Sequence, residues 1–457
     1  MIEFLNTVIG AATPIAVLLT GGAFALGLRG LPFTRPRLCV RAVGRAMGSG
    51  RSGTSPFRSL ALALAGTLGV GNIVGVTSAI ALGGAGAVFW MWVSALFATF
   101  LKYAEVVLAL VHRENLANGS HRGGAPYYIR ARLTRVGLVR LAPLAALLFA
   151  LLCLVNALLM GCMLQTNAVA RAMSDCFSLP PLVSGVALAL ACLILLTRGG
   201  RAVSAATSVL VPLMSAVFLA LSLAALWIRR EALPIAFANI LREAFSPLAA
   251  GGGILGFLTS RALRMGTIRG IISNEAGCGT SPTAHAASDA KSPVEQGLFG
   301  ILEVMVDTLV LCTVTALVTL VSQDGSSLSA QDPLSATLSA YSAAFGGATW
   351  VKALLALCIL CFGFATLLCW AHYGMEAFRF LTSHKKNAPP HGRTSLFFCF
   401  AFGLFAVAGA VSAPNLVWSL TDLITGIMTL LNCAVLLLSL QEIKRQTTTY
   451  FGKNRKL

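Results

Sequence analysis

The stretch Gly66-Thr67-Leu68-Gly69-Val70-Gly71-Asn72-Ile73-Val74-Gly75 decides the fold, and it lies inside an apolar run over about residues 57–82. A run of that length crosses the ~30 Å hydrocarbon core of a membrane as a helix. The clustered glycines loosen the helix, and an unwound segment in lipid leaves carbonyl and amide groups without partners. An ion or substrate can supply them, because freed carbonyls ligate a hard cation and a half-helix N-terminus attracts a carboxylate. The small side chains leave room for little more than a compact amino acid.

A second glycine-rich stretch lies five spans further on, within residues 235–288. Its glycines are Gly251, Gly252, Gly253, Gly256, Gly266, Gly270, Gly277 and Gly279. Helices five spans apart cross in opposite directions, and a pair of interrupted helices of this kind indicates an inverted-repeat transporter with a binding site at the midplane. The alternative is that the glycines only pack helices together. The break falls either at residues 251–256 or near Asn274, and both stay open because Arg261, Arg264 and Arg269 would be costly at the bilayer centre.

The composition of the whole chain agrees with a membrane protein. Apolar residues make up 57% of the 457 residues, charged residues only 11%, and the mean hydropathy is +0.81. Soluble chains carry about a quarter charged residues. The apolar runs predict about eleven spans, at roughly 4–28, 57–82, 86–111, 142–172, 181–197, 202–228, 235–288, 295–321, 350–380, 394–412 and 415–440. We expect a single all-α transmembrane domain.

The net charge of +18 is concentrated in connectors beside these runs. The connector 29–56 is rich in arginine, as are 113–141 and 198–201, and lysine and arginine also occur in 384–393 and in the tail 444–457. Short basic loops stay in the cytoplasm, so this pattern indicates orientation in a cell membrane rather than nucleic-acid binding. With an odd number of spans, the N-terminus lies outside and the C-terminus inside.

Twelve cysteines lie almost entirely within the apolar runs, so no disulfide framework is expected. Cys358 and Cys361 have CxxC spacing but sit within a span, where they are more often small core residues than a redox or metal site. The first apolar run follows Met1-Ile2-Glu3 without a basic segment, which favours a retained helix over a cleaved signal peptide.

Several ordered motifs resemble those of the alanine or glycine:cation symporter family. Residues 66–75 are similar to its GTxGxGNIxG motif, and 83–92 to its GGxGAVFWMW signature. Further matches are Lys102-Tyr103-Ala104-Glu105, Gly123-Gly124, Tyr127-Tyr128-Ile129, Arg269-Gly270, Ser273-Asn274-Glu275-Ala276-Gly277, Ala284-His285-Ala286, Gln296-Gly297, Asp307-Thr308 and Cys312-Thr313. A later stretch, 364–370, resembles the family's FxTxLxW region.

The resemblance implies a fold like that of the leucine transporter, with two inverted five-helix repeats preceded by one extra helix. The divisions would be 1–56 (extra helix and basic connector), 57–228 (first repeat), 229–443 (second repeat) and 444–457 (cytoplasmic tail). It also implies symport of alanine, glycine or a similar amino acid with Na⁺, or less often H⁺, by a monomeric chain without a cofactor or catalytic residue.

The expected binding residues come partly from the broken stretch and partly from the resemblance. The substrate residues would be Gly69, Gly71, Asn72, Gln165, Asn274 and Trp370. Sodium would be held by main-chain oxygens of Gly66, Thr67 and Gly69 and by the hydroxyl of Thr366. For Gln165 and Asn167 an interhelical hydrogen bond is the plain alternative, and Trp370 could equally serve packing. Glu275 could be a gate or helix cap rather than a ligand.

Other acids in or near spans are Glu105, Glu303, Asp307, Glu376 and Asp422. Each could join a gate or proton relay, although pairing with a nearby arginine is at least as plausible. Departures from the family, such as Ala365 beside Thr366 and Val70 for a common threonine, concern ion and cargo choice more than fold. A membrane channel is the alternative of another class; an enzyme would need a nucleophile, base or metal motif that the sequence does not offer.

Overall fold

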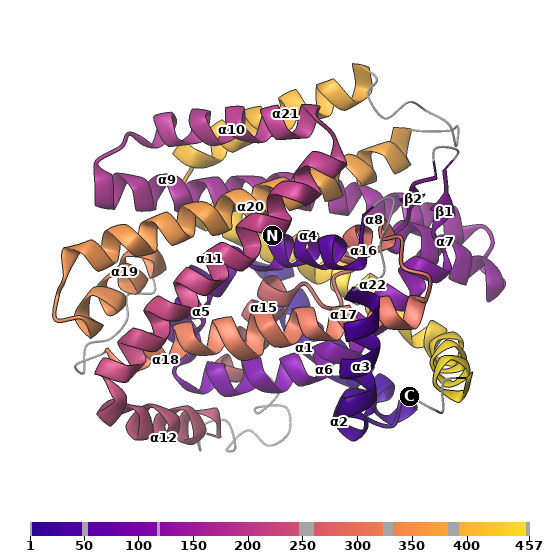
Figure 1. The fold of residues 1–457 in the computed structure, drawn as a ribbon, viewed down its shortest axis with the longest axis horizontal. Helices are drawn as coiled ribbons and strands as arrows, with labels where there is room; N and C mark the ends of the chain where they lie inside the picture. Colours follow the sequence, from indigo (N-terminus) through magenta and orange to yellow (C-terminus); the bar gives the residue numbers. More distant parts are fainter. Residues whose placement is uncertain are drawn as a thin grey trace.

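The computed structural model describes residues 2–47, 54–116, 119–245, 260–322, 332–382 and 393–453 (Figure 1). Its first part contains α1 (Ile2–Gly27), α2 (Leu31–Thr34), α3 (Pro36–Met47), α4 (Pro56–Thr67), the 3₁₀ turn η1 (Val70–Asn72), α5 (Val74–Gly83), α6 (Gly86–Val111) and α7 (Ala125–Arg135). Between α6 and α7, β1 (Glu114–Asn115) and β2 (His121–Arg122) pair antiparallel, with Glu114 opposite Arg122.

The middle part contains α8 (Leu141–Leu158), the π-helical η2 (Leu159–Met163), α9 (Leu164–Phe177), α10 (Pro181–Thr197), α11 (Gly200–Ile228), η3 (Arg230–Ala232) and α12 (Leu233–Ala244). The last part contains α15 (Arg261–Asn274), α16 (Pro282–Ala286), α17 (Pro293–Val304), the π-helical η4 (Met305–Cys312), α18 (Thr313–Val321), α19 (Pro333–Ala344), α20 (Thr349–Thr382), α21 (Arg393–Val411) and α22 (Pro414–Lys453).

Many of these helices are long and apolar enough to cross a membrane. In the part of the chain that is described, these are Phe4–Gly27, Gly86–Val111, Leu141–Phe177, Gly200–Ile228, Pro293–Val321, Thr349–Thr382 and Val417–Gly452, with shorter apolar helices at Val74–Gly83, Pro181–Thr197 and Ser395–Val411. The expectation of a helical, multi-pass membrane protein is therefore confirmed. The number of eleven spans and the division into repeats stay predictions.

Local capping signals start several of these helices. Ser55, Ser292 and Asp332 each precede a proline, and each side chain accepts a hydrogen bond from the backbone N–H three residues on. A polar N-cap followed by proline at the first helical position satisfies an otherwise free donor and presets the helical backbone. The sequence therefore fixes where α4, α17 and α19 begin, which in turn fixes the position of the residues they carry.

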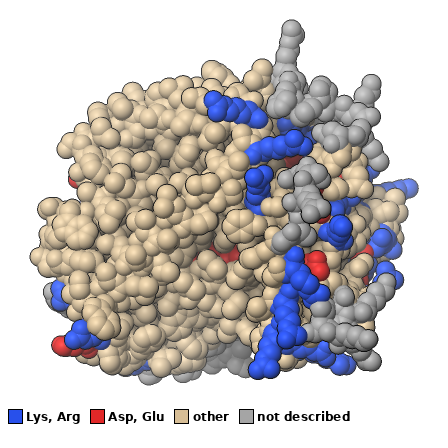
Figure 2. Space-filling model, in the orientation of Figure 1, with Lys and Arg blue, Asp and Glu red and all other residues tan. Residues whose placement is uncertain are grey.

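The surface separates into a charged end and a broad uncharged belt (Figure 2). Lysine and arginine gather on the side where Figure 1 places α3 and α7, and tan residues cover most of the rest of this face. Large apolar side chains of α8, α11 and α21 are 61 to 69% exposed, namely Leu144, Val209, Leu213, Phe397 and Phe400. An apolar belt of this extent is expected of a protein whose sides face lipid rather than water.

Three connectors contain structure that the sequence pattern did not predict. The arginine-rich connector after α1 forms α2 and α3, the connector after α6 forms the β1–β2 hairpin and α7, and α19 lies between α18 and α20. The helix that carries the last span continues through Lys444 and Arg445 to Lys453, within the segment expected as a tail.

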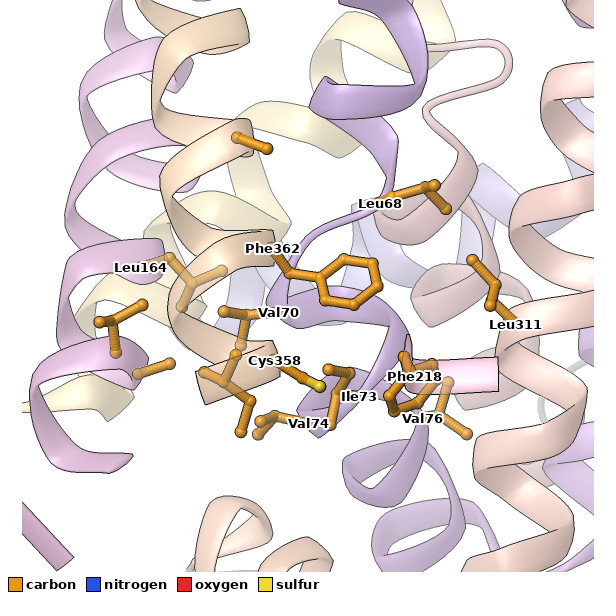
Figure 3. Packing of buried hydrophobic residues seen from close by; sticks show 14 of the residues in the cluster. Leu68, Val70, Ile73, Val74, Val76, Leu164, Phe218, Leu311, Cys358 and Phe362 are labelled. Atoms are coloured by element: carbon orange, nitrogen blue, oxygen red, sulfur yellow. The ribbon is translucent and has the colours of Figure 1, made fainter. Parts of the chain in front are cut away.

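The broken stretch passes through the middle of the core (Figure 3). Leu68, Val70 and Ile73 are fully buried, and the close-up shows Phe362 of α20 directed toward this segment with Leu164 of α9 nearby. Apolar packing on several sides thus holds an irregular backbone in place. Non-helical backbone at membrane depth is tolerated only when protein surrounds it in this way.

Candidate functional site

The first interrupted helix is visible as α4, a short unwound segment and α5. α4 ends at Thr67, Gly69 is extended with φ −121° and ψ −159°, and the single turn η1 leads into α5. The Asn72 side chain closes this turn, because its Oδ1 accepts a hydrogen bond of 3.1 Å from the Gly69 N–H. The predicted loosening of this span is therefore observed, and it falls at the glycine cluster.

The second interruption follows α15. This helix ends at Asn274, whose Oδ1 accepts a hydrogen bond of 2.9 Å from the Ala276 N–H, and Glu275 caps it at a positive φ of 54°. Gly277 and Gly279 also have positive φ, of 85° and 80°, which glycine adopts without strain, before α16 begins. Of the two alternatives, the break near Asn274 is present, and residues 251–256 lie outside the described part.

The two interrupted helices lie side by side and run in opposite directions. A Cβ added to Gly71, before α5, would lie 3.7 Å from the Ser273 Cα at the end of α15. A Cβ added to Gly83, at the end of α5, would lie 3.2 Å from the carbonyl oxygen of Arg261 at the start of α15. The start of one helix therefore meets the end of the other, which is the antiparallel arrangement that the sequence predicted.

Oxygen atoms converge beside the first break. The Thr366 Oγ1 of α20 lies 2.9 Å from the Ala65 carbonyl oxygen, 3.4 Å from that of Leu68 and 2.9 Å from that of Phe362. A hydroxyl has a single hydrogen and cannot satisfy three acceptors at once. A cluster of carbonyl and hydroxyl oxygens without acidic groups is the donor set that suits a hard monovalent cation.

The carbonyls named from the sequence are not the ones that meet Thr366. The Thr67 carbonyl accepts from the Gly69 N–H at 2.9 Å, the Gly69 carbonyl accepts from the Asn72 N–H at 3.2 Å, and the Thr67 hydroxyl faces its own helix. Gly66 instead contributes space, because an added Cβ would lie 2.9 Å from the Cys369 Sγ. Ala65 and Leu68 were missed because a carbonyl oxygen leaves no mark in the residue type.

Gln165 contacts the unwound segment, and Trp370 packs against the π-helical turn η2 beside it. The Gln165 Oε1 accepts a hydrogen bond of 3.0 Å from the Val70 N–H, and its Nε2 donates to the Met160 carbonyl at 3.2 Å. Trp370 is fully buried against Gly161, where any added Cβ would collide with the indole, and its N–H has no partner within the described chain. π-turns such as η2 occur frequently at functional sites because they redirect side chains and free carbonyls.

A buried carboxylate lies on the other side of the break. The Asp307 carboxylate, on η4, accepts hydrogen bonds from the Asn72 side chain, from the Ser273 hydroxyl at 2.9 Å and from the Thr308 hydroxyl at 2.9 Å. Asn274 reaches it indirectly, by donating to the Thr308 hydroxyl at 3.1 Å. No Lys, Arg or His of the described ranges lies within ion-pair distance of Asp307, so the arginine partner considered from sequence is absent there. The Asp307 carboxylate thus links the two interrupted helices.

Other polar residues of the sequence analysis serve packing or ion pairs. The Asn167 side chain donates to the carbonyls of Gly409 and Ser412 at 3.0 and 2.7 Å, which is the interhelical bond considered for it. Glu376 pairs with Arg122 at 2.9 Å and with Arg379 at 2.7 Å, near the β hairpin. Asn167 also lines the cavity that opens onto the first break.

A cavity of about 290 Å³ opens onto the first break from the end opposite the basic face. Val70 and Val74 line its inner part, and two ion pairs border it: Arg269 with Asp422 at 3.0 Å, and Arg171 with Asp332 at 2.9 Å. The Arg269 guanidinium also stacks 4.4 Å from the centre of the Trp418 ring. Charged side chains that join separate helices across a cavity mouth are suited to opening and closing it.

Asp332 is the part of this border that lies outside the spans. Burial alone would raise the pKa of Asp332, but the hydrogen bonds from Ser335 and the charge of Arg171 outweigh burial and hold the pKa below its ordinary value. The carboxylate is therefore ionised at neutral pH, and the pair with Arg171 stays formed there.

The chain is similar in sequence to known transporters. The model of the sodium:alanine symporter family matches residues 1–457. The sodium/alanine symporter AgcS of Methanococcus maripaludis is 34% identical over 446 residues, which cover 96% of this chain and 94% of that protein. The probable sodium/glutamine symporter GlnT of Bacillus subtilis is 32% identical over 439 residues, which cover 95% and 87%.

Solved structures agree on the fold. The structure of a Na⁺-coupled sialic acid symporter in a substrate-bound, outward-open state superimposes with a TM-score of 0.56 at 13% identity, covering 94% of this chain and 86% of that one. A manganese transporter of Eremococcus coleocola gives a TM-score of 0.53 at 17% identity, covering 87% and 88%. At these identities the likeness concerns the fold alone.

Proposed function

Because the chain belongs to the sodium:alanine symporter family, we propose that it carries a small neutral amino acid, such as alanine or glycine, together with Na⁺. The two relatives described above are both named as symporters of sodium and an amino acid, and alanine or glycine with Na⁺ is the specific choice that we propose for this chain. The observation that carries the proposal is the meeting of Thr366 with the freed carbonyls of Ala65 and Leu68 at a broken helix.

The sodium ion would bind at this oxygen cluster. Unwinding after Thr67 turns the last carbonyls of α4 away from helical partners, and α20 supplies the Thr366 hydroxyl opposite them. Ala365 adds no side-chain oxygen, so Thr366 provides the only hydroxyl of that neighbouring pair. The negative end of the α4 dipole adds to the attraction.

The amino acid would bind between the two breaks. Its carboxylate would face the N-terminal side of η1 and α5, near Gly69, Gly71 and Asn72, because the N-terminus of a half-helix attracts an anion. Its ammonium group would approach the C-terminal end of α15 near Asn274, and the Asp307 carboxylate would balance its charge. Gln165 and Trp370 would close the sides.

Transport would proceed by alternating access. The Arg269–Asp422 and Arg171–Asp332 pairs border the cavity on the outer side, and occupation by ion and amino acid together would close that path before the basic side opens. In this proposal the N-terminus lies outside, the basic C-terminal end lies in the cytoplasm, and one chain suffices, with residues 57–228 and 229–443 as the two repeats.

Uptake by purified protein in liposomes tests the proposal. Labelled alanine and glycine should accumulate when Na⁺ is higher outside, and a parallel arm should replace the Na⁺ gradient with an H⁺ gradient. Uptake that is indifferent to both gradients would reject coupled symport, and uptake driven by H⁺ alone would reject Na⁺.

The same assay tests the Thr366 hydroxyl. Loss of the contact between the Thr366 hydroxyl and Na⁺ should cost about 1.4 kcal/mol of binding free energy or more. Thr366→Ala should therefore raise the Na⁺ half-saturation concentration roughly tenfold. Thr366→Ser keeps the hydroxyl and should stay close to the unmodified protein. An unchanged half-saturation in Thr366→Ala would count against a ligand role.

A further inference from the structure

A second buried polar cluster lies on the basic side of the broken helices and takes no part in the site above. Lys102 of α6, His285 of α16 and Glu303 of α17 are all fully buried. The Lys102 Nζ lies 3.3 Å from the Glu303 Oε1 and donates to the Ser281 hydroxyl at 2.6 Å. The His285 Nε2 lies 3.0 Å from the Glu303 Oε2.

Glu303 is the shared partner of the two basic side chains in this cluster. The Lys102 Nζ and the His285 Nε2 each lie against one oxygen of its carboxylate. The Gln296 side-chain nitrogen lies 2.8 Å from the other ring nitrogen of His285, and the Gln296 oxygen accepts a hydrogen bond of 3.2 Å from the Ser288 hydroxyl. Lys102 and His285 therefore both have Glu303 as their acidic partner.

Two further carboxyl groups beside this pair have no cation of their own. Glu105 and Glu275 are both at most 1% exposed. The Glu105 Oε1 accepts from the Gly279 N–H at 2.9 Å and from the Asn432 side chain at 2.6 Å, while its Oε2 has no partner. The Glu275 Oε2 accepts a hydrogen bond from the Thr280 hydroxyl, while its Oε1 has no partner. Across the described ranges, no Lys, Arg or His forms an ion pair with either one.

Unlike Asp307, whose two oxygens both accept hydrogen bonds, each of these carboxylates has one buried oxygen that no donor of the described residues reaches. Such a charge is too costly to persist, so either a metal ion or a proton must neutralise each group. A metal ion is disfavoured, because no three acidic, histidine or cysteine side chains in the described part converge as metal ligands would. We propose that Glu105 and Glu275 form a proton-binding site, each carrying a proton on the carboxyl oxygen that no donor reaches.

The position of this site links it to the movement of the chain. Glu275 is the first residue after α15, and Glu105 holds the Gly279 N–H of the same connecting segment. Asn432 of α22 binds both Glu105 and the Gly277 carbonyl, the latter at 2.9 Å. The two neutral carboxyls thus fasten the segment between α15 and α16 against α6 and α22.

Displacement of this segment admits water to both carboxyls, which then release their protons. This step rests on the proposed function, because the segment is itself the second break and its displacement belongs to the proposed movement between the two open states. Acid pH is therefore expected to favour the conformation described here, in which the segment is fastened, over one open to the basic side.

Several other titratable groups face the two carboxyls from the elements packed around them. They are Lys102 of α6, Tyr128 of α7, His285 of α16, Glu303 of α17, Asp307 of η4 and Tyr373 of α20. The thiols of Cys153, Cys278, Cys369 and Cys433 complete the surroundings. Of these, Lys102 is positively charged, and its ion pair is with Glu303.

Amide substitutions in purified protein, without amino acid or ion gradient, test the protonation state. Glutamine mimics a protonated carboxyl, so Glu105→Gln and Glu275→Gln should keep the melting temperature measured at neutral pH. The matched control Glu303→Gln removes the charged partner of Lys102 and should clearly lower the melting temperature. Glu105→Gln or Glu275→Gln proteins as unstable as Glu303→Gln would overturn the proposal, and so would stabilisation of the unmodified protein by Na⁺ that Glu105→Gln abolishes.

Infrared spectroscopy supplies a measurement on the unmodified protein. The spectrum at neutral pH should contain the carbonyl stretch of protonated carboxyl groups, and Glu105→Gln and Glu275→Gln should each remove part of it. Absence of any such band, or a band that both variants leave unchanged, would contradict the proposal. Because neither measurement involves transport, their failure is distinguishable from failure of the uptake assay.

Discussion

Gly69 leaves no room for a side chain between Thr366 and Gln165. A Cβ at this residue would lie 2.7 Å from the Thr366 Oγ1 and 3.0 Å from the Gln165 Oε1. Gly69→Ala should therefore push the Thr366 hydroxyl away from the carbonyls of α4, at an overpacking cost of about 1–3 kcal/mol. We expect a Na⁺ half-saturation concentration at least about fivefold higher, measured by uptake in liposomes.

Gly75 provides the matched control, because an added Cβ there would lie 3.9 Å from its nearest neighbour, the Trp418 ring. Gly75→Ala introduces the same methyl group into α5, where alanine favours the helix. Its Na⁺ half-saturation should stay unchanged. Equal effects of the two substitutions would show that glycine matters for helix flexibility in general and not for space beside Thr366.

Single residues differ in how far the sequence revealed them. Thr366 and Gln165 carry side-chain groups that are costly in lipid, and both reach the unwound segment. Ala65 and Leu68 act through carbonyl oxygens, which every residue possesses, so no residue type could mark them. Asp307 was noted as an acid, but its link to Asn72 and Ser273 depends on three elements distant in the chain.

Among the elements, the glycine clusters predicted interruption in both helices. The first break could be placed within a few residues, because Gly66, Gly69 and Gly71 surround it. The second could not, because glycines occur on both sides of the arginines of α15, and the position of the observed break after Asn274 follows from long-range packing against α5 and α6. The amphipathic α3 was missed because its arginines were considered only for charge.

The Arg269–Asp422 ion pair, which joins α15 to α22, is expected to hold the outer side of the cavity closed. Asp422→Asn breaks the 3.0 Å contact with Arg269, and loss of about 1 kcal/mol should shift the balance toward an open outer cavity about fivefold. Ser78 lines that cavity, so a membrane-impermeant thiol reagent should label Ser78→Cys several-fold faster in the Asp422→Asn protein, after correction for native thiols.

An ion pair at the basic end supplies the comparison. Glu376→Gln breaks the contact with Arg122 near the β hairpin and should not speed labelling of Ser78→Cys. If Asp422→Asn leaves the labelling rate unchanged, or Glu376→Gln raises it equally, the Arg269–Asp422 pair does not control access from the outer side.

For the whole molecule, hydropathy and charge predicted most of the architecture. Apolar runs long enough to span a bilayer and arginine-rich connectors are properties of sequence alone, and the structure shows a helical bundle with most of the basic residues of the visible face gathered toward one end (Figure 2). How the bundle brings α4, α9, α15, α20 and η4 to one place follows from long-range packing instead. The site therefore emerges only with the fold.

The central claim is that ion and amino acid occupy neighbouring sites at the two breaks and stabilise each other. Binding of labelled alanine to purified protein at constant pH and ionic strength tests this most directly, with Na⁺ replaced stepwise by choline. Linkage requires that Na⁺ tighten alanine binding and that alanine tighten Na⁺ binding by the same factor. The account predicts an alanine dissociation constant that falls at least about tenfold as Na⁺ rises; alanine binding of equal strength in Na⁺ and in choline would contradict it.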